Sequence, residues 1–106
     1  MTGAAGDRRV VLRDDRGPRG TWSEWATLSG AGLRVEGQSL SGDDEYEFAV
    51  DVAPGQVPAL LAALGAPAAA DVLDALVAYS RGGGRGLTRL LRDAGVEHRR
   101  WNRVGG

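Results

Sequence analysis

Residues 45 to 52 alternate strictly between large apolar side chains and acidic or small ones. The first set is Tyr46, Phe48, Val50 and Val52, and the second is Glu45, Glu47, Ala49 and Asp51. Successive side chains of a β-strand point to opposite faces, so this period of two predicts a strand with one face in the core and the other in solvent. Such a strand must pair with others and bury its apolar face beneath a second layer, which constrains the fold more than any other feature.

Three earlier segments also have the composition of strands: residues 8–13, 21–28 and 33–36. Residues 29–32 are predicted to form a hairpin turn, whereas 14–20 and 37–44 are rich in Gly, Asp and Ser and are predicted to be loops. Alternation along the second segment places Trp22 and Trp25 on opposite faces of the sheet.

The second half of the chain has a helical period instead. Apolar residues recur at spacings of three and four in three segments, which predicts helices over residues 58–64, 69–80 and 87–94. Gly65 and the glycines of residues 82–86 separate these helices. Residues 96–101 are compatible with one more short strand.

These patterns predict one α+β domain over residues 1–106. It consists of an antiparallel β-meander of about four strands followed by three short helices packed on one face, with a possible short C-terminal strand. A chain of 106 residues suffices for one such core. Residues 1–7 and 102–106 are expected to be disordered tails.

Composition excludes several classes of function. The chain has no cysteine, so it has neither a disulfide framework nor a thiolate for catalysis or zinc binding. His98 is the single histidine, and a metal site needs further ligands. The hydroxyl residues stand in no nucleophile motif. We therefore expect no enzyme, no metal and no cofactor.

We expect neither a membrane-spanning helix nor a signal peptide in this sequence. No apolar run approaches the roughly 18 residues of a transmembrane helix, and residues 1–7 lack the apolar core of a signal peptide. The chain is therefore expected to be a cytoplasmic protein that does not contact a membrane.

Charge is segregated along the chain. Residues 21–80 carry nine acidic residues against Arg34 alone, which is a net charge of −8 for that part. If helices cover one sheet face, the other exposes a tryptophan among carboxylates, together with Arg34 and Glu36. The residues expected to bind a partner are Trp25, Glu45, Glu47 and Asp51. Tryptophan is enriched in binding hot spots and carboxylates attract a basic partner, so this face predicts a protein-binding domain.

The alternative function uses the basic C-terminal region. Its candidate anion or nucleic-acid ligands are Arg81, Arg85, Arg89, Arg92, Arg99 and Arg100. Trp101 could stack on a base, and the glycines of residues 82–86 could approach a phosphate. No Walker motif follows those glycines, and the acidic middle of the chain opposes a polyanion. A homodimer formed through an unpaired edge strand is a third alternative to a monomer.

Five stretches carry a resemblance to known sequences. They are Gly37-Gln38-Ser39-Leu40, Asp44-Glu45-Tyr46-Glu47-Phe48, residues 57–65, residues 71–76 and Trp101. Over residues 21–101 the chain resembles small uncharacterised proteins of actinobacteria, some of which are similar in size and layout to immunity proteins of polymorphic toxin systems. The resemblance implies a protein that neutralises a toxin, and with the acidic sheet face it predicts a basic partner; it implies no catalytic or binding residue.

Overall fold

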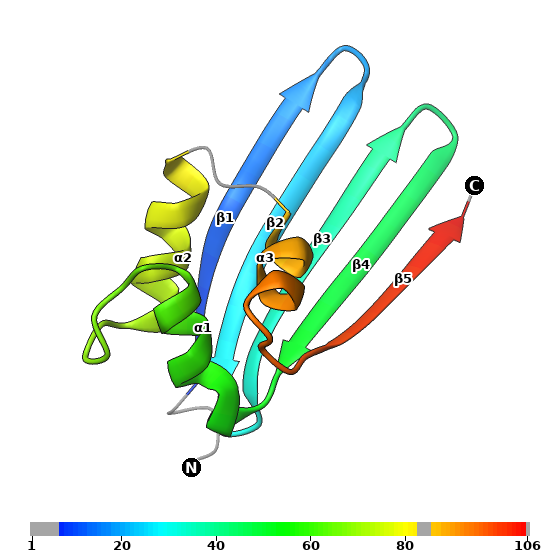
Figure 1. Ribbon diagram of the computed structural model, residues 1–106. Coiled ribbons are helices and arrows are strands. Elements are labelled where there is room, and N and C mark those ends of the chain that lie inside the picture. The colour runs from blue at the N-terminus through cyan, green and yellow to red at the C-terminus, as the bar shows by residue number, and fades with distance from the viewer. Residues whose placement is uncertain (1–6, 83–85, 106) are drawn as a thin grey trace.

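The computed structural model describes residues 7–82 and 86–105, and it shows a five-stranded antiparallel sheet (Figure 1). The strands are β1 (Arg8–Gly17), β2 (Gly20–Ser29), β3 (Gly32–Ser41), β4 (Asp44–Val52) and β5 (Arg99–Gly105). Their order in the sheet is their order in the chain. The predicted α+β class, the meander and the additional C-terminal strand are confirmed.

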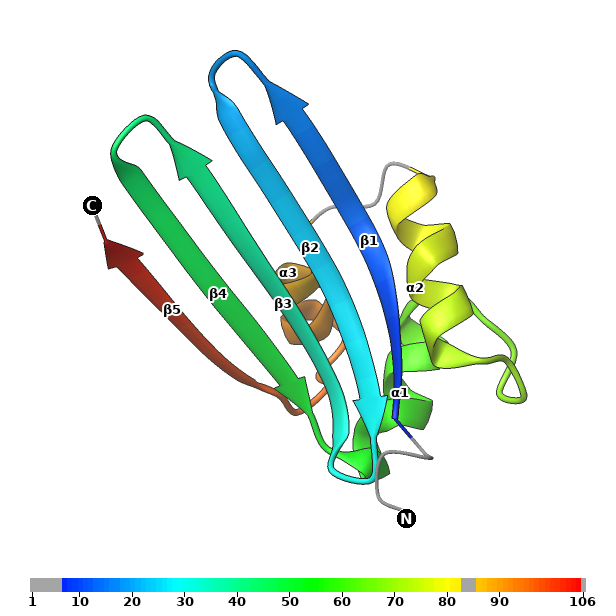
Figure 2. The ribbon, with the colours of Figure 1, turned by 180° about the vertical axis from the view of Figure 1, so that it is seen from behind.

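The helices lie between β4 and β5 in the chain and cover one face of the sheet (Figure 1). They are the short 3₁₀ helix η2 (Pro54–Gln56), α1 (Val57–Ala63), α2 (Val72–Arg81) and α3 (Leu87–Asp93). Seen from behind, the other face of the sheet carries no second layer of the described chain (Figure 2). Among the described residues, no helix has both the length and the apolar character needed to cross a lipid bilayer.

The core lies between the sheet and these helices. Alternate residues of the inner strands point into it, and they meet the apolar stripes of the three α-helices. Its fully buried members include Ala26, Leu33, Val35, Val50, Val52, Leu60, Leu73, Leu76 and Leu91. The predicted apolar face of β4 is confirmed, although Tyr46 and Phe48 are only half-buried because the helices do not reach the far end of the sheet.

Two segments predicted to be loops belong to strands instead. The β1–β2 ladder continues to Gly17 opposite Gly20, and the β3–β4 ladder continues to Ser41 opposite Asp44. The loops predicted at residues 14–20 and 37–44 are therefore wrong except at their turns. Gly, Asp and Ser favour turns locally, but here hydrogen bonding to a partner strand overrides that preference.

The last strand also differs from its prediction. It begins at Arg99 rather than residue 96, and it pairs with β4 along its length, from Asp51 opposite Arg99 to Glu45 opposite Gly105. Residues 102–105, expected to be part of a disordered tail, are therefore in a strand, because the unpaired edge of β4 gives them hydrogen-bond partners. The tail predicted at the other end lies outside the described residues at positions 1–6.

Helix α2 is joined to the edge of the sheet at its first turn. It begins three residues later than predicted because Asp71 is its N-cap, with Oδ1 accepting hydrogen bonds from the backbone N–H of Leu73 (2.9 Å) and Asp74 (3.2 Å). The other carboxylate oxygen accepts from Arg8 of β1. The side-chain hydrogen bond from Arg8, helped by the two backbone bonds, lowers the pKa of Asp71.

Candidate functional site on the open face

The face of the sheet that the helices leave bare contains the residues predicted to bind a partner. Trp25 of β2 and Glu45, Glu47 and Asp51 of β4 share it, because their register positions all point away from the helical layer. Trp22, three positions before Trp25, lies on the helix face. The structure thus places each tryptophan of β2 on its own side of the sheet.

One row of side chains crosses this open face from edge to edge. Val11 is opposite Trp25, Trp25 opposite Glu36, Glu36 opposite Ala49, and Ala49 opposite Trp101. Directly opposed residues of antiparallel strands have their side chains on the same face. We call these five residues the aromatic row. Beside the row, a hollow of about 140 Å³ lies between the two tryptophans, and Glu36, Gln38 and Glu47 also line it.

Exposed apolar side chains are concentrated on this side. Of the four large hydrophobic residues that are exposed in the described chain, Val11 (65%), Leu40 (44%) and Trp101 (42%) lie on the open face. Val104 (79%) is the exception and lies on the other face. Single exposed hydrophobic residues are ordinary, but Val11 and Trp101 are the two ends of the aromatic row, with Trp25 between them, and apolar side chains aligned on an uncovered sheet face favour an interaction site.

Arginines of the open face are engaged within the protein. The guanidinium of Arg9 stacks over Trp25 at 4.9 Å from the ring centroid, and that of Arg34 lies 5.7 Å from the centroid of Trp101. Arg34 Nε is also 3.2 Å from a carboxylate oxygen of Glu36 and 3.5 Å from one of Asp51. Arg34 therefore links the aromatic row to the acidic residues beside it.

Strand β5 changes the charge expected for this face. It places Arg99 opposite Asp51 and Arg103 opposite Glu47. Each of these two carboxylates thus has an arginine on the neighbouring strand, and docking through an acidic surface stays a prediction. The face carries mixed charge around an aromatic centre.

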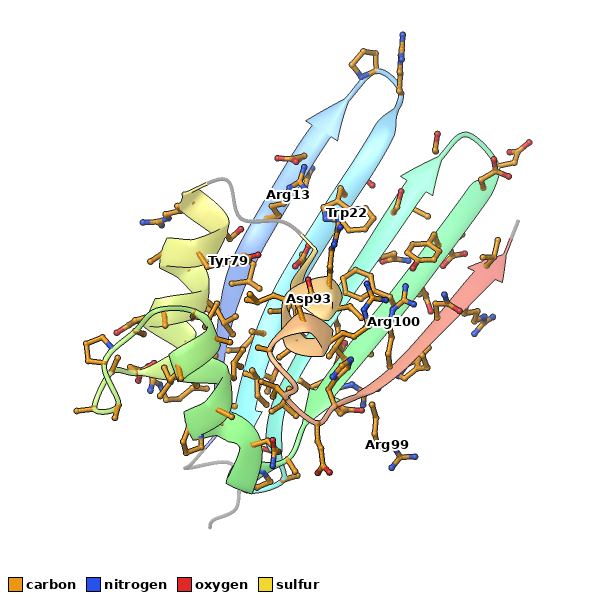
Figure 3. The ribbon with its side chains drawn as sticks, in the orientation of Figure 1. Arg13, Trp22, Tyr79, Asp93, Arg99 and Arg100 are labelled. Carbon is orange, nitrogen blue, oxygen red and sulfur yellow. The ribbon has the colours of Figure 1, made fainter. Side chains whose placement is uncertain are left out.

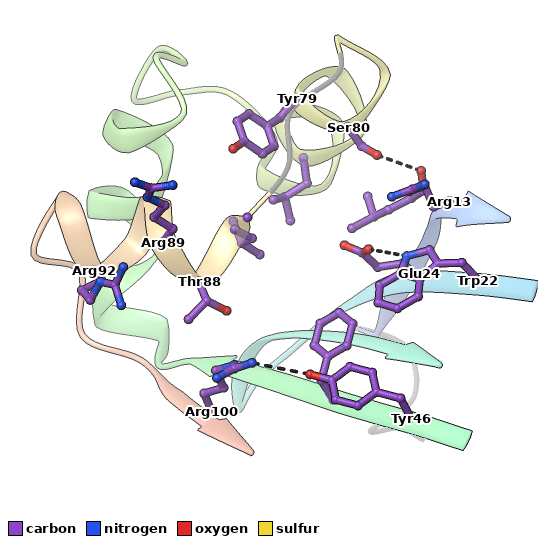
Figure 4. A pocket seen from close by; sticks show the side chains of 15 residues that line it. Arg13, Trp22, Glu24, Tyr46, Tyr79, Ser80, Thr88, Arg89, Arg92 and Arg100 are labelled. Atoms are coloured by element: carbon purple, nitrogen blue, oxygen red, sulfur yellow. Dashed lines mark hydrogen bonds between the residues drawn. The ribbon is translucent and has the colours of Figure 1, made fainter. Parts of the chain in front are cut away.

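The arginines of the alternative function do not form one surface. Arg99 lies on the open face, Arg81 is exposed at the end of α2, and Arg85 lies outside the described residues. Arg89, Arg92 and Arg100 line one pocket on the helix face (Figure 4), and Figure 3 shows the positions of Arg100 and of Trp22, which lines the same pocket. The structure thus places the five described candidates at three separate positions.

Sequence reasoning missed two contributors to these sites. Trp101 was assigned only to the nucleic-acid alternative, since its position in the aromatic row depends on the pairing of β5 with β4. Arg13 is the second, and nothing in its sequence neighbourhood points to a binding role. A bulge between Val11 and Arg13 shifts the register of β1, so that Arg13 lies opposite Glu24 and lines the pocket on the helix face. No local signal in the sequence identifies that bulge.

The described part of the chain brings together no group of three or more His, Cys, Asp or Glu side chains suited to hold a metal ion. Comparison with known proteins finds no matching family model, no matching curated protein and no matching solved structure. The resemblance to immunity proteins remains a prediction from the sequence.

Proposed function

We propose that this chain is a non-catalytic protein-binding domain of the cytoplasm and that the aromatic row is the centre of its binding surface. One observation carries the proposal: three of the four exposed large hydrophobic residues of the described chain lie on the one sheet face that no helix covers. An apolar group in that position is stabilised when a partner removes it from water.

The chemistry of the row fits an interface core. Tryptophan and arginine dominate binding hot spots, and here Trp25 and Trp101 stand at the two sides of a hollow with arginines stacked on them. An apolar side chain of the partner can enter the hollow between the two indole rings. The charged residues that flank the row form a polar rim of the kind that surrounds such cores.

The partner need not be basic. Because Arg34, Arg99 and Arg103 stand beside the carboxylates of this face, apolar contact with the tryptophans supplies most of the affinity. A protein that neutralises a toxin is one member of this functional class, as the resemblance in the sequence suggests. A second copy of the chain could also occupy the face. Sedimentation at several protein concentrations distinguishes such a homodimer from a complex with another protein.

The experiment compares two exposed valines on opposite faces. The tagged chain is used to capture proteins from the cells that produce it, and Val11→Asp is compared with Val104→Asp, both surface substitutions expected to change stability by less than about 0.5 kcal/mol. We expect Val11→Asp to lose the captured protein and Val104→Asp to retain it. Trp101→Ala should weaken the same complex by about 2 kcal/mol, the loss typical of a hot spot.

Charge reversal tests the acidic-face hypothesis separately. The double variant Glu45→Lys with Glu47→Lys should leave the captured protein bound if the aromatic row is the centre of the surface. A complex that survives both Val11→Asp and Trp101→Ala contradicts the proposal. If only the charge-reversed variant loses the captured protein, the result would instead support an acidic docking surface for a basic partner.

A further inference from the structure

A pocket opens on the helix face where the helical layer ends. Its volume is about 430 Å³, within the range of about 300–1,000 Å³ common for small-molecule sites. One wall comes from β1, β2, β4 and β5, and the other from α2 and α3 (Figure 4). The pocket is on the opposite side of the sheet from the aromatic row, so it is a separate site from the proposed docking surface.

Three aromatic rings form the sheet side of this pocket. The ring centroids of Trp22 and Phe48 are 5.7 Å apart and those of Phe48 and Tyr46 are 6.2 Å apart, with interplanar angles of 21° and 29°. We call these three residues the aromatic wall. Strand β3 makes room for it with small residues. A Cβ atom at Gly37 would be 2.1 Å from Cε1 of Phe48, and Ser39 lies between Trp22 and Tyr46 in the register.

Arginines gather at one side of the wall. Arg89 and Arg92 extend from α3, and Arg100 extends from β5 toward Tyr46; all three line the pocket (Figure 4). Nη2 of Arg100 donates a hydrogen bond to the hydroxyl of Tyr46 at 3.5 Å, which ties this guanidinium to the aromatic wall. We call Arg89, Arg92 and Arg100 the arginine rim.

The arginine rim has little compensating negative charge. Among the described residues Arg89 and Arg100 form no ion pair, and Arg92 has only its exposed neighbour Asp93, at 4.0 Å. The carboxylate that lines the pocket, Glu24, is at the other side, where it accepts a hydrogen bond from Nε1 of Trp22 at 3.1 Å (Figure 4). Arg13 lies beside Glu24 but is paired with Asp15, so the pocket is polarised between this charge-compensated end and the uncompensated arginine rim.

We propose that this pocket binds a small molecule in which a planar ring carries a phosphate or a carboxylate. The ring stacks on the aromatic wall, as bases and aromatic ligands do on tryptophan and tyrosine. Its anionic group lies at the arginine rim, where guanidinium groups donate paired hydrogen bonds to planar or tetrahedral oxyanions. Glu24 can accept a hydrogen bond from a ring N–H at the opposite end.

The distribution of the other arginines favours a single anionic group over a nucleic-acid strand. A strand of several nucleotides requires a continuous basic track along its backbone. Here Arg99 lies on the opposite face and Arg13 is neutralised by Asp15, whose carboxylate accepts from its Nε at 2.9 Å. The rim is thus a local anion site rather than part of a groove.

The three tryptophans provide the test. The indole N–H signals of Trp22, Trp25 and Trp101 are followed by NMR while phenyl phosphate, AMP or benzoate is added, with inorganic phosphate and phenol as controls that lack the ring or the anion. We expect Trp22 to shift saturably with at least one aromatic anion, which should bind at least about tenfold more tightly than inorganic phosphate. Trp25 and Trp101 should not move.

Adjacent arginines on opposite faces supply matched variants. Arg100→Gln removes a member of the rim, whereas Arg99→Gln removes the same charge one residue away. Loss of one charge-assisted contact should weaken binding about tenfold to hundredfold in Arg100→Gln, with less than a threefold change in Arg99→Gln. The pair Arg89→Gln and Arg81→Gln repeats the comparison on helices.

Four results would overturn the proposal. The first is equal affinity for inorganic phosphate and the best aromatic anion, and the second is an equal effect of Arg100→Gln and Arg99→Gln. The third is the absence of a saturable Trp22 shift with any probe at millimolar concentration. The fourth is tighter binding of a single-stranded oligonucleotide than of AMP, with a steep salt dependence. The last result would indicate a nucleic-acid interface instead.

Discussion

Arg34 on the open face and two arginines on the helix face of the same sheet differ in their ion pairing. On the open face, Arg34 lies between two carboxylates and over a tryptophan ring. On the helix face, Arg89 and Arg100 line a pocket without a carboxylate partner in the described chain. Charge that is already paired contributes little further attraction, whereas unpaired charge beside a pocket attracts an anion.

This difference separates two kinds of binding in one small domain. Association through the open face should depend weakly on salt, because apolar contacts dominate it. Binding at the pocket should weaken as salt screens the arginine rim. The following substitutions affect one face more than the other, and we order them from the largest expected effect to the smallest.

Leu91→Ala should remove the pocket and spare the open face. Leu91 is the one buried residue of α3 and is fully inaccessible to solvent, so its truncation should lower the free energy of unfolding by about 2–5 kcal/mol. Urea denaturation measures that loss, and the Trp22 signal reports the pocket. Leu90→Ala, at a half-buried neighbour, is the control and should cost less. Equal losses would show that α3 is not anchored through Leu91.

Gly37→Ala should disturb the aromatic wall from beneath. The added methyl group would overlap the ring of Phe48, and overpacking of this kind costs about 1–3 kcal/mol. Gly30→Ala is the matched control, because no atom lies within 4 Å of its added Cβ. Thermal unfolding of both variants tests the contact. A stable Gly37→Ala protein with an unshifted Trp22 signal would contradict this account of the wall.

Asp71→Ala should loosen α2 from the sheet edge by about 1 kcal/mol, the usual cost of losing an N-cap. The folded-state pKa of Asp71 is lowered, so its ionised form contributes stability above the unfolded pKa of about 3.9. That contribution is lost as the pH falls through the lower folded-state value.

Asp71→Asn removes the negative charge but keeps the helix N-cap, because asparagine is also a good N-cap residue. Urea midpoints should therefore differ between the wild-type protein and Asp71→Asn at neutral pH, and the difference should disappear in strong acid. A difference that persists at the lowest pH would show that the ion pair with Arg8 is not its source.

Alternation along β2 and β4 was enough to predict which side chains share a face. It placed Trp22 and Trp25 on opposite sides and grouped Glu45 with Asp51, and the structure agrees. Local composition gave the wrong secondary structure where pairing with a neighbouring strand determines it. Residues 14–17 and 37–41 have turn-forming side chains, but they extend both hairpins because each lies beside a partner strand.

Neither site could be assembled from the sequence, because both depend on contacts between distant segments. The aromatic row joins residues of β2 and β5 that are separated by two strands. The arginine rim joins α3 to β5, and the aromatic wall requires Gly37 to stand beneath Phe48. Periodicity indicates which way a side chain points, but it does not indicate which remote residue becomes its neighbour.

Arg100 and Trp101 are consecutive residues that serve opposite faces. A slip of β5 by one residue would exchange their faces, with Trp101 opposite Phe48 on the helix face and Arg100 opposite Ala49 on the open face. The link from α3 prevents this: the backbone N–H of Val96 donates to Leu91, and Val96 is buried. The five residues between α3 and β5 therefore set the register of β5. Deleting one of them would move Arg100 to the open face and Trp101 to the helix face.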